Sequence, residues 1–138
     1  MANSKNQTEK FNKIENLVKG TFTDDQKRAI LYSLILIAKS DGEYHQNERI
    51  TLDITAHFLN YNINDIKFMQ YHSLGKEIMY QHLNSLNSNQ KDWYILSVFG
   101  MITADFQYKE IEDAFANHFF EKMEISKDYI DRLVEQYQ

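Results

Sequence analysis

Residues 23–48 read TDDQKRAILYSLILIAKSDGEYHQNE, and this stretch decides the fold class. Its first four residues form a capping-box pattern, in which a threonine and a glutamine satisfy free amides at a helix start. From residue 29 to residue 38 apolar side chains fall on nearly every helical face, which is typical of a helix buried in a bundle. Asp41-Gly42 ends this helix, and the apolar spacing of Ile50, Ile54 and Phe58 predicts another over about 47–59.

The same pattern recurs 64 residues later, where a second all-round apolar helix runs from Trp93 to Ala104. Identities gather where each apolar helix ends: Asp41 with Asp105, Tyr44 with Tyr108, and Glu48 with Glu112. Elsewhere Gln26, Lys27, Ser33 and Ile66 recur as Gln90, Lys91, Ser97 and Ile130. These matches predict a duplicated helix–elbow–helix unit. We call residues 41–48 the first elbow and residues 105–112 the second.

The remaining segments also have helical periods. A first helix ends before Gly20, a polar and aromatic helical region divided at Gly75 extends to about residue 86, and Ser126 caps a last helix. We therefore expect an all-α single domain over 1–138, a bundle of about seven helices. It comprises an N-terminal helical extension (1–22), a first repeat (24–74) and a second repeat (88–138). Gly100, amid bulky apolar residues, is expected to face a closely packed helix.

Composition excludes several classes of protein. The 138 residues contain no cysteine, so disulfides and thiolate sites are excluded, and a reducing compartment suits the chain. A net charge of −5 argues against nucleic-acid binding. The most apolar run, 29–38, is too short to span a membrane, and the polar first residues do not form a signal peptide, so we expect a cytoplasmic protein.

Acidic charge gathers at the elbows. Residues 41–59 carry a net charge of −3 and residues 105–124 carry −4, so the rest of the chain is positive. Asp41 and Asp105 each follow the C-terminus of a helix, where the helix dipole disfavours a carboxylate. One interpretation is that both aspartates cap turns. The other is that converging elbows offer carboxylates to calcium, magnesium or manganese.

Residues 34–58, LILIAKSDGEYHQNERITLDITAHF, resemble the TerB-like family of tellurite-resistance proteins, which is also seen in the N-terminal region of DjlA-type co-chaperones. The signature is an apolar helix ending in Ala-x-x-Asp-Gly-Glu, followed by an acidic helix. The resemblance covers about residues 24–138, although Phe106 and Gln107 replace the second Gly-Glu. It implies two all-helical units, a link to stress response, no established catalysis and an acidic, metal-binding surface. The metal-ligand candidates are Asp41, Glu43, Glu48, Asp105 and Glu112.

Enzyme motifs are missing from the sequence. There is no HExxH, GxGxxG, phosphate-binding loop or GxSxG. His45 is either an exposed loop residue or a further metal ligand, and Asp53 with His57 is best interpreted as a surface pair. Paired acids could serve a glycosidase, but a chain this small offers little cleft for a sugar.

We therefore predict a non-enzymatic, acidic interaction module that binds a divalent cation in a stress context. The alternative is a purely structural protein–protein adaptor or dimerisation module without a metal. Either function involves a protein partner or a homo-oligomer, with no nucleic acid and no membrane span. Exposure of Tyr61, Phe68, Tyr71 and Tyr80 would mark an interaction face, although ordinary packing is the favoured interpretation.

Overall fold

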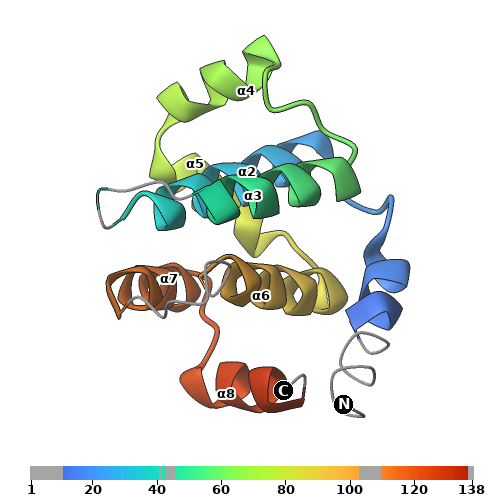
Figure 1. The fold of residues 1–138 in the computed structure, drawn as a ribbon, viewed down its shortest axis with the longest axis vertical. Coiled ribbons are helices and arrows are strands. Elements are labelled where there is room, and N and C mark those ends of the chain that lie inside the picture. Colours follow the sequence, from blue (N-terminus) through green and yellow to red (C-terminus); the bar gives the residue numbers. More distant parts are fainter. Residues whose placement is uncertain (1–10, 41, 43–45, 103–109, 137–138) are drawn as a thin grey trace.

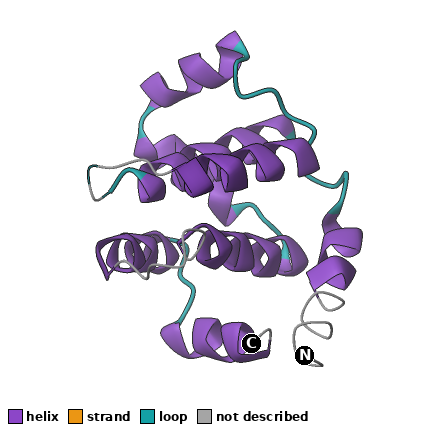
Figure 2. Cartoon of the chain, in the orientation of Figure 1, coloured by secondary structure: helices purple, strands orange, loops and turns teal. Residues whose placement is uncertain are grey.

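The protein is all-α, as the sequence predicts (Figure 2). The computed structural model describes residues 11–40, 42, 46–102 and 110–136, except for the side chains of 110–113 and 115. All regular secondary structure in these residues is helical. No helix among them has the length and apolarity needed to cross a bilayer.

A helix over residues 11–18 precedes the labelled elements. These are α2 (Asp24–Ala38), α3 (Gln46–Phe58), α4 (Ile66–Tyr71), the 3-10 turn η1 (His72–Leu74), α5 (Lys76–Asn84), α6 (Ser88–Ile102), α7 (Glu110–Lys122) and α8 (Lys127–Gln136). In Figure 1 they lie in layers. The α4 helix is uppermost, α2, α3 and α5 follow, α6 and α7 form the next layer, and α8 lies below them.

Local signals in the sequence account for several helix boundaries. The Thr23 side chain accepts from the Gln26 amide at 3.1 Å, and the Gln26 side chain accepts from the Thr23 amide at 2.9 Å, which confirms the capping box. Gly75 has φ 91°, which a side chain would disfavour, and it separates η1 from α5 as predicted. Ser126 accepts from the Tyr129 amide at 3.2 Å and so caps α8.

The core is built around the two apolar helices, α2 and α6, which pack against each other. Trp93 of α6 lies between two aromatic rings, with centroid distances of 5.2 Å to Phe22 and 5.1 Å to Phe58 of α3. Phe68, Tyr71 and Tyr80 are buried, which confirms ordinary packing for these aromatics.

The prediction for Gly100 is wrong. Gly100 is exposed, and a Cβ atom placed there would meet nothing within 4 Å among the described residues. The apolar residues around it belong to the buried faces of α6, whereas position 100 falls on the outer face.

The apolar residues of α3 are also only partly buried. Leu52 and Ala56 enter the core, whereas Ile50 and Ile54 are 48% and 64% exposed.

Candidate functional site

The predicted metal ligands belong to the two elbows, and the structure describes the side chain of one of them. Asp41, Glu43 and Asp105 lie outside the described residues, as does His45. Glu112 lies in α7, but its side chain is outside the described part. Glu48 lies in the first turn of α3 and is only 2% exposed.

The first elbow begins with a tight turn. After α2 ends, the Ser40 hydroxyl donates to the Ile37 carbonyl at 2.7 Å, and the Gly42 amide donates to the Lys39 carbonyl at 3.0 Å. Gly42 has φ 86°, a conformation that favours glycine. This is the sharp turn that the Asp-Gly pattern predicts.

The buried carboxyl of Glu48 combines a favourable and an unfavourable effect. Its place in the first turn of α3 is favourable, because the helix dipole presents positive charge there. Its burial is unfavourable, because a carboxylate removed from water needs compensating donors or a cation. Carboxylate oxygens are also the ligands that hard divalent cations prefer. Glu48 therefore fits either a cap of α3 or a metal ligand, and it points to the N-terminus of α3 as the place to test.

Reciprocal glutamine contacts, which sequence reasoning did not anticipate, join each repeat to the residues just before the other repeat. The Gln26 amide nitrogen donates to the Ser85 hydroxyl at 3.1 Å and lies 3.4 Å from the Ser85 carbonyl. The Gln90 amide nitrogen donates to the Thr21 hydroxyl at 3.0 Å and lies 3.4 Å from the Thr21 carbonyl. Each glutamine also closes its own capping box, Gln26 with Thr23 and Gln90 with Asn87.

The residues that make these contacts are related by the same 64-residue shift as the two repeats. Thr21 corresponds to Ser85, Thr23 to Asn87 and Gln26 to Gln90. Each capping glutamine thus reaches the residue two positions before the other repeat's cap. The available signal in the sequence was a hydroxyl residue two positions before each cap, Thr21 before Thr23 and Ser85 before Asn87. Hydrophobic periodicity does not reveal it, because a side-chain contact between two segments leaves no periodic pattern.

The glutamine contacts hold the N-termini of α2 and α6 together. Further along, the buried Tyr94 hydroxyl lies 2.7 Å from the Ser33 hydroxyl, so the two helices are also in contact near their middles. Both helices have 15 residues and run from right to left in Figure 1. The C-termini of α2 and α6 therefore point to the same end of the bundle.

Another polar cluster joins α2 to the segments around α4 and α5. Arg28 donates to the Tyr61 hydroxyl at 2.8 Å and to Asp25 at 3.0 Å. His82 lies 3.8 Å from Asp25, and its Nδ1 lies 2.7 Å from the Tyr71 hydroxyl. Burial raises the pKa of the Tyr71 phenol well above its usual value, so this hydroxyl stays protonated and holds α4 against α5.

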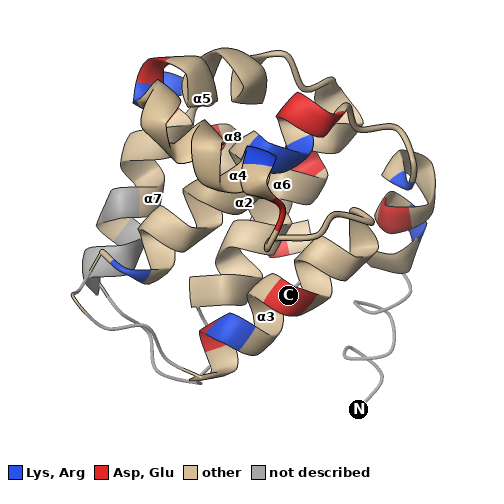
Figure 3. Ribbon diagram, turned by 90° about the horizontal axis from the view of Figure 1, so that it is seen from above, with Lys and Arg blue, Asp and Glu red and all other residues tan. Residues whose placement is uncertain are grey.

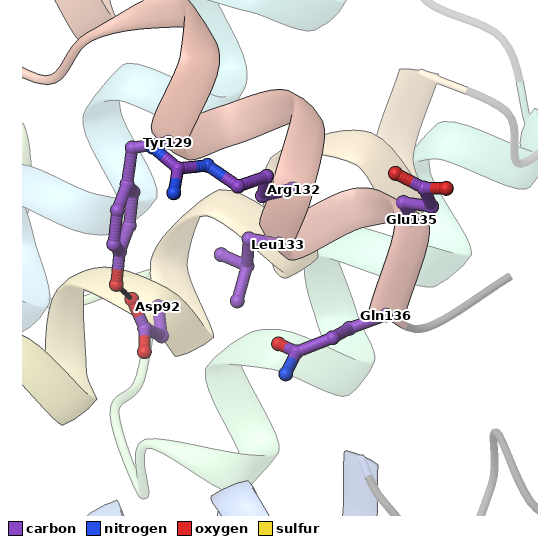
Figure 4. A pocket seen from close by; sticks show the side chains of 6 residues that line it. All are labelled: Asp92, Tyr129, Arg132, Leu133, Glu135 and Gln136. Carbon is purple, nitrogen blue, oxygen red and sulfur yellow. Dashed lines mark hydrogen bonds between the residues drawn. The ribbon is translucent and has the colours of Figure 1, made fainter.

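A hollow of about 510 Å³ lies between α6 and α8 (Figure 4). Tyr129 of α8 donates a hydrogen bond to Asp92 of α6 across one side of this hollow. Partial burial, together with this carboxylate, raises the pKa of Tyr129 to about 12. Arg132 and Glu135 complete a mixed-charge lining. The contact between Tyr129 and Asp92 fastens α8 to the bundle.

In the described part of the chain, no three histidine, aspartate or glutamate side chains are placed to share a metal ion.

Comparison with known proteins bears on the first half of the chain. The family model for tellurite resistance protein TerB matches residues 2–70, which include the first elbow and half of the chain. Neither the search of curated proteins nor that of solved structures found a match. The matched segment holds the Ala-x-x-Asp-Gly-Glu motif, the turn at Gly42 and the buried Glu48. The chain belongs to the TerB family, which is linked to tellurite resistance.

Proposed function

We propose that this TerB-like domain is a non-enzymatic, acidic interaction module that binds a divalent cation where its two elbows meet. The proposed ligands are Asp41, Glu43 and Glu48 from the first elbow, with Asp105 and Glu112 from the second. Calcium, magnesium or manganese suits this set, since each prefers carboxylate oxygens. We further propose a cytoplasmic role in a stress response of the tellurite-resistance type.

The observation that carries the proposal is the common direction of α2 and α6. The glutamine contacts hold their N-termini together, and the described C-terminal ends of both helices point to one end of the bundle. Carboxylates from two elbows at one end repel each other, and a bound cation relieves that repulsion.

The experiment is thermal unfolding of the full chain after chelation, with calcium, magnesium and manganese added back separately. A cation that binds only the folded state must raise Tm with the logarithm of its excess over Kd. At one hundred times Kd the gain is about 2.7 kcal/mol, which is about 9 °C for a chain of this length.

Variants identify the ligands. Asp41→Asn should remove most of the shift, and Asp105→Asn should remove less, since its elbow lacks the turn glycine. Asp131→Asn, at an exposed position of α8, is the matched control and should leave the shift unchanged. A chelated protein that shows neither a thermal shift nor heat in calorimetric titration at millimolar metal would refute the proposal. The domain would then be a structural adaptor with capping aspartates.

A further inference from the structure

A groove lies on the surface between the helix over residues 11–18, α3 and α6. Its volume is about 170 Å³, close to the roughly 150 Å³ of an engineered protein cavity that binds benzene. The groove can therefore enclose an apolar group of about the size of one benzene ring. Phe11, Phe58 and Leu96 supply apolar walls. Phe58 is the last residue of α3, whereas the divalent cation is proposed to bind at the other end of that helix.

The groove is open beside α6 because residue 100 has no side chain. Gly100 lines the groove at an exposed position, and a Cβ atom placed there would meet nothing within 4 Å among the described residues. Glycine weakens a helix, and no close packing within the described residues requires it here. A large side chain at this position would extend into the groove, so the glycine leaves room for a ligand.

One acidic side chain gives the groove its charge. Charged residues of both signs occur along the described helices (Figure 3), but of the described residues that line this groove only Glu15 is charged. Burial raises the pKa of the Glu15 carboxyl, and the positive charge of Lys19, one turn further along the helix, opposes this rise without cancelling it. A carboxylate that is partly removed from water is stabilised by a positive charge beside it.

The hydroxyl groups that line the groove also act as acceptors. The Thr51 hydroxyl donates to the Asn47 carbonyl at 2.9 Å, and the Thr55 hydroxyl donates to the Thr51 carbonyl at 2.9 Å. The Ser97 hydroxyl donates to the Trp93 carbonyl at 2.8 Å. Since each of these protons is used within its own helix, the hydroxyl oxygens can only accept a hydrogen bond from a ligand. The indole N–H of Trp93 is fully buried and therefore out of a ligand's reach.

We propose that this groove binds a small organic ammonium ion whose hydrocarbon part is about the size of one ring. Glu15 balances the positive charge, and the hydroxyl oxygens accept hydrogen bonds from the ammonium group. The hydrocarbon part packs against Leu96 and the rings of Phe11 and Phe58, and aromatic rings also attract a cation.

Other classes of small ligand fit this groove less well. An anion is repelled by the carboxylate of Glu15. A neutral hydrocarbon fills the same space but leaves the carboxylate and hydroxyl oxygens without a donor, which is unfavourable once water is displaced. Size, charge and hydrogen bonding therefore all select a cationic donor with an apolar body.

The experiment is titration of the full chain with benzylammonium chloride at neutral pH and constant ionic strength, followed by tryptophan fluorescence. Trp93 is the only tryptophan of the chain and it lines the groove, so its emission reports occupancy. Benzyl alcohol has nearly the same shape without the charge and is the control ligand. We expect saturable binding of benzylammonium, at least tenfold tighter than that of benzyl alcohol.

Variants test the residues that would bind the ligand. Glu15→Gln should weaken benzylammonium binding at least tenfold and leave benzyl alcohol binding nearly unchanged. Asp53→Asn is the matched control, because it removes the same charge from an exposed position of α3 outside the groove, and it should change neither affinity. Gly100→Leu should abolish binding of both ligands by filling the groove. Circular dichroism checks that each variant remains folded.

Three results would overturn the proposal: no saturable fluorescence change with benzylammonium, equal affinity for benzylammonium and benzyl alcohol, or equal weakening by Glu15→Gln and Asp53→Asn. Chelation of divalent metal should leave benzylammonium binding unchanged, since the groove and the proposed elbow site lie at opposite ends of α3. Failure of either proposal can thus be distinguished from failure of the other.

Discussion

Replacing Gln26 by glutamate tests the contact that holds the two repeats in register. The side chain is only 8% exposed, and its amide nitrogen faces the hydroxyl and carbonyl oxygens of Ser85. Gln26→Glu preserves the shape and the acceptor of the capping box. However, it replaces the amide donor by an oxygen, and the Ser85 hydroxyl that it faces already donates its proton to the His82 carbonyl. The same change at Gln90, which is 3% exposed, sets a carboxylate against Thr21.

The expected loss follows from these contacts. A lost hydrogen bond lowers stability by about 1 kcal/mol, and a buried group left facing acceptors by a further 1–3 kcal/mol. The helix dipole returns about 0.5 kcal/mol, since the new charge lies in a first turn. Each variant should therefore lose about 1.5–3.5 kcal/mol at neutral pH. At about 3 °C per kcal/mol, Tm falls by about 5–10 °C.

The assay is thermal unfolding followed by circular dichroism at pH 7 and pH 4. Burial among acceptors raises the folded-state pKa of the new carboxyl above its unfolded value. Its relative stability is therefore present at low pH and lost as pH rises, so the deficit should shrink at pH 4. Asn89→Asp is the control, because it adds the same charge to the same turn of α6 at an exposed position. If Gln90→Glu unfolds like Asn89→Asp, the two helix N-termini are not held as the structure shows.

The Ser33–Tyr94 contact should respond asymmetrically, because both side chains are fully buried and the Ser33 hydroxyl also donates to the Ile30 carbonyl. Denaturant unfolding should show a loss of about 1 kcal/mol for Tyr94→Phe but 2–3 kcal/mol for Ser33→Ala, which leaves the phenol without its acceptor; equal losses would contradict this hydrogen-bond direction. Ultraviolet titration should place the Tyr129 pKa at about 12, and Asp92→Asn should lower it. Since the folded-state pKa is raised, the stability contributed by Tyr129 is present below about pH 10 and lost as pH rises through about 12; a pKa unchanged by Asp92→Asn would contradict the contact.

The fold could be predicted where each boundary depends on local chemistry. Thr23 with Gln26, Gly75 and Ser126 each act within one turn of the backbone, so residue type and spacing were sufficient. Predictions failed where a helix face had to be assigned. The composition around Gly100 indicated burial, but which face of α6 is covered depends on neighbours far along the chain. Ile50 and Ile54 show the same limit, since their four-residue spacing equally fits an exposed apolar stripe.

The candidate site also has features that the sequence predicts and features that it does not. The Asp-Gly turn was predictable because Gly42 adopts a conformation that favours glycine. The burial of Glu48 was not, because a charged residue in a first helical turn is ordinarily exposed. The approach of the two repeats depends on Gln26 and Gln90, whose contacts join residues 59 and 69 positions apart in sequence. The duplicated sequence indicates that two units exist, but only the side-chain contacts show how they face each other.

Whether two elbows can share one ion depends on how far α2 and α6 diverge. A helix of 15 residues is about 22 Å long. A crossing angle of about 50° would therefore separate two C-termini by about 17 Å more than their N-termini, whereas about 20° would add only about 8 Å. Ser33 lies about 14 Å along α2 and Tyr94 about 9 Å along α6, yet their hydroxyls are 2.7 Å apart. Side chains that still touch at that depth favour the shallower angle. A single cation shared by both repeats remains our proposal, and thermal unfolding of the chelated protein with each metal added back tests it.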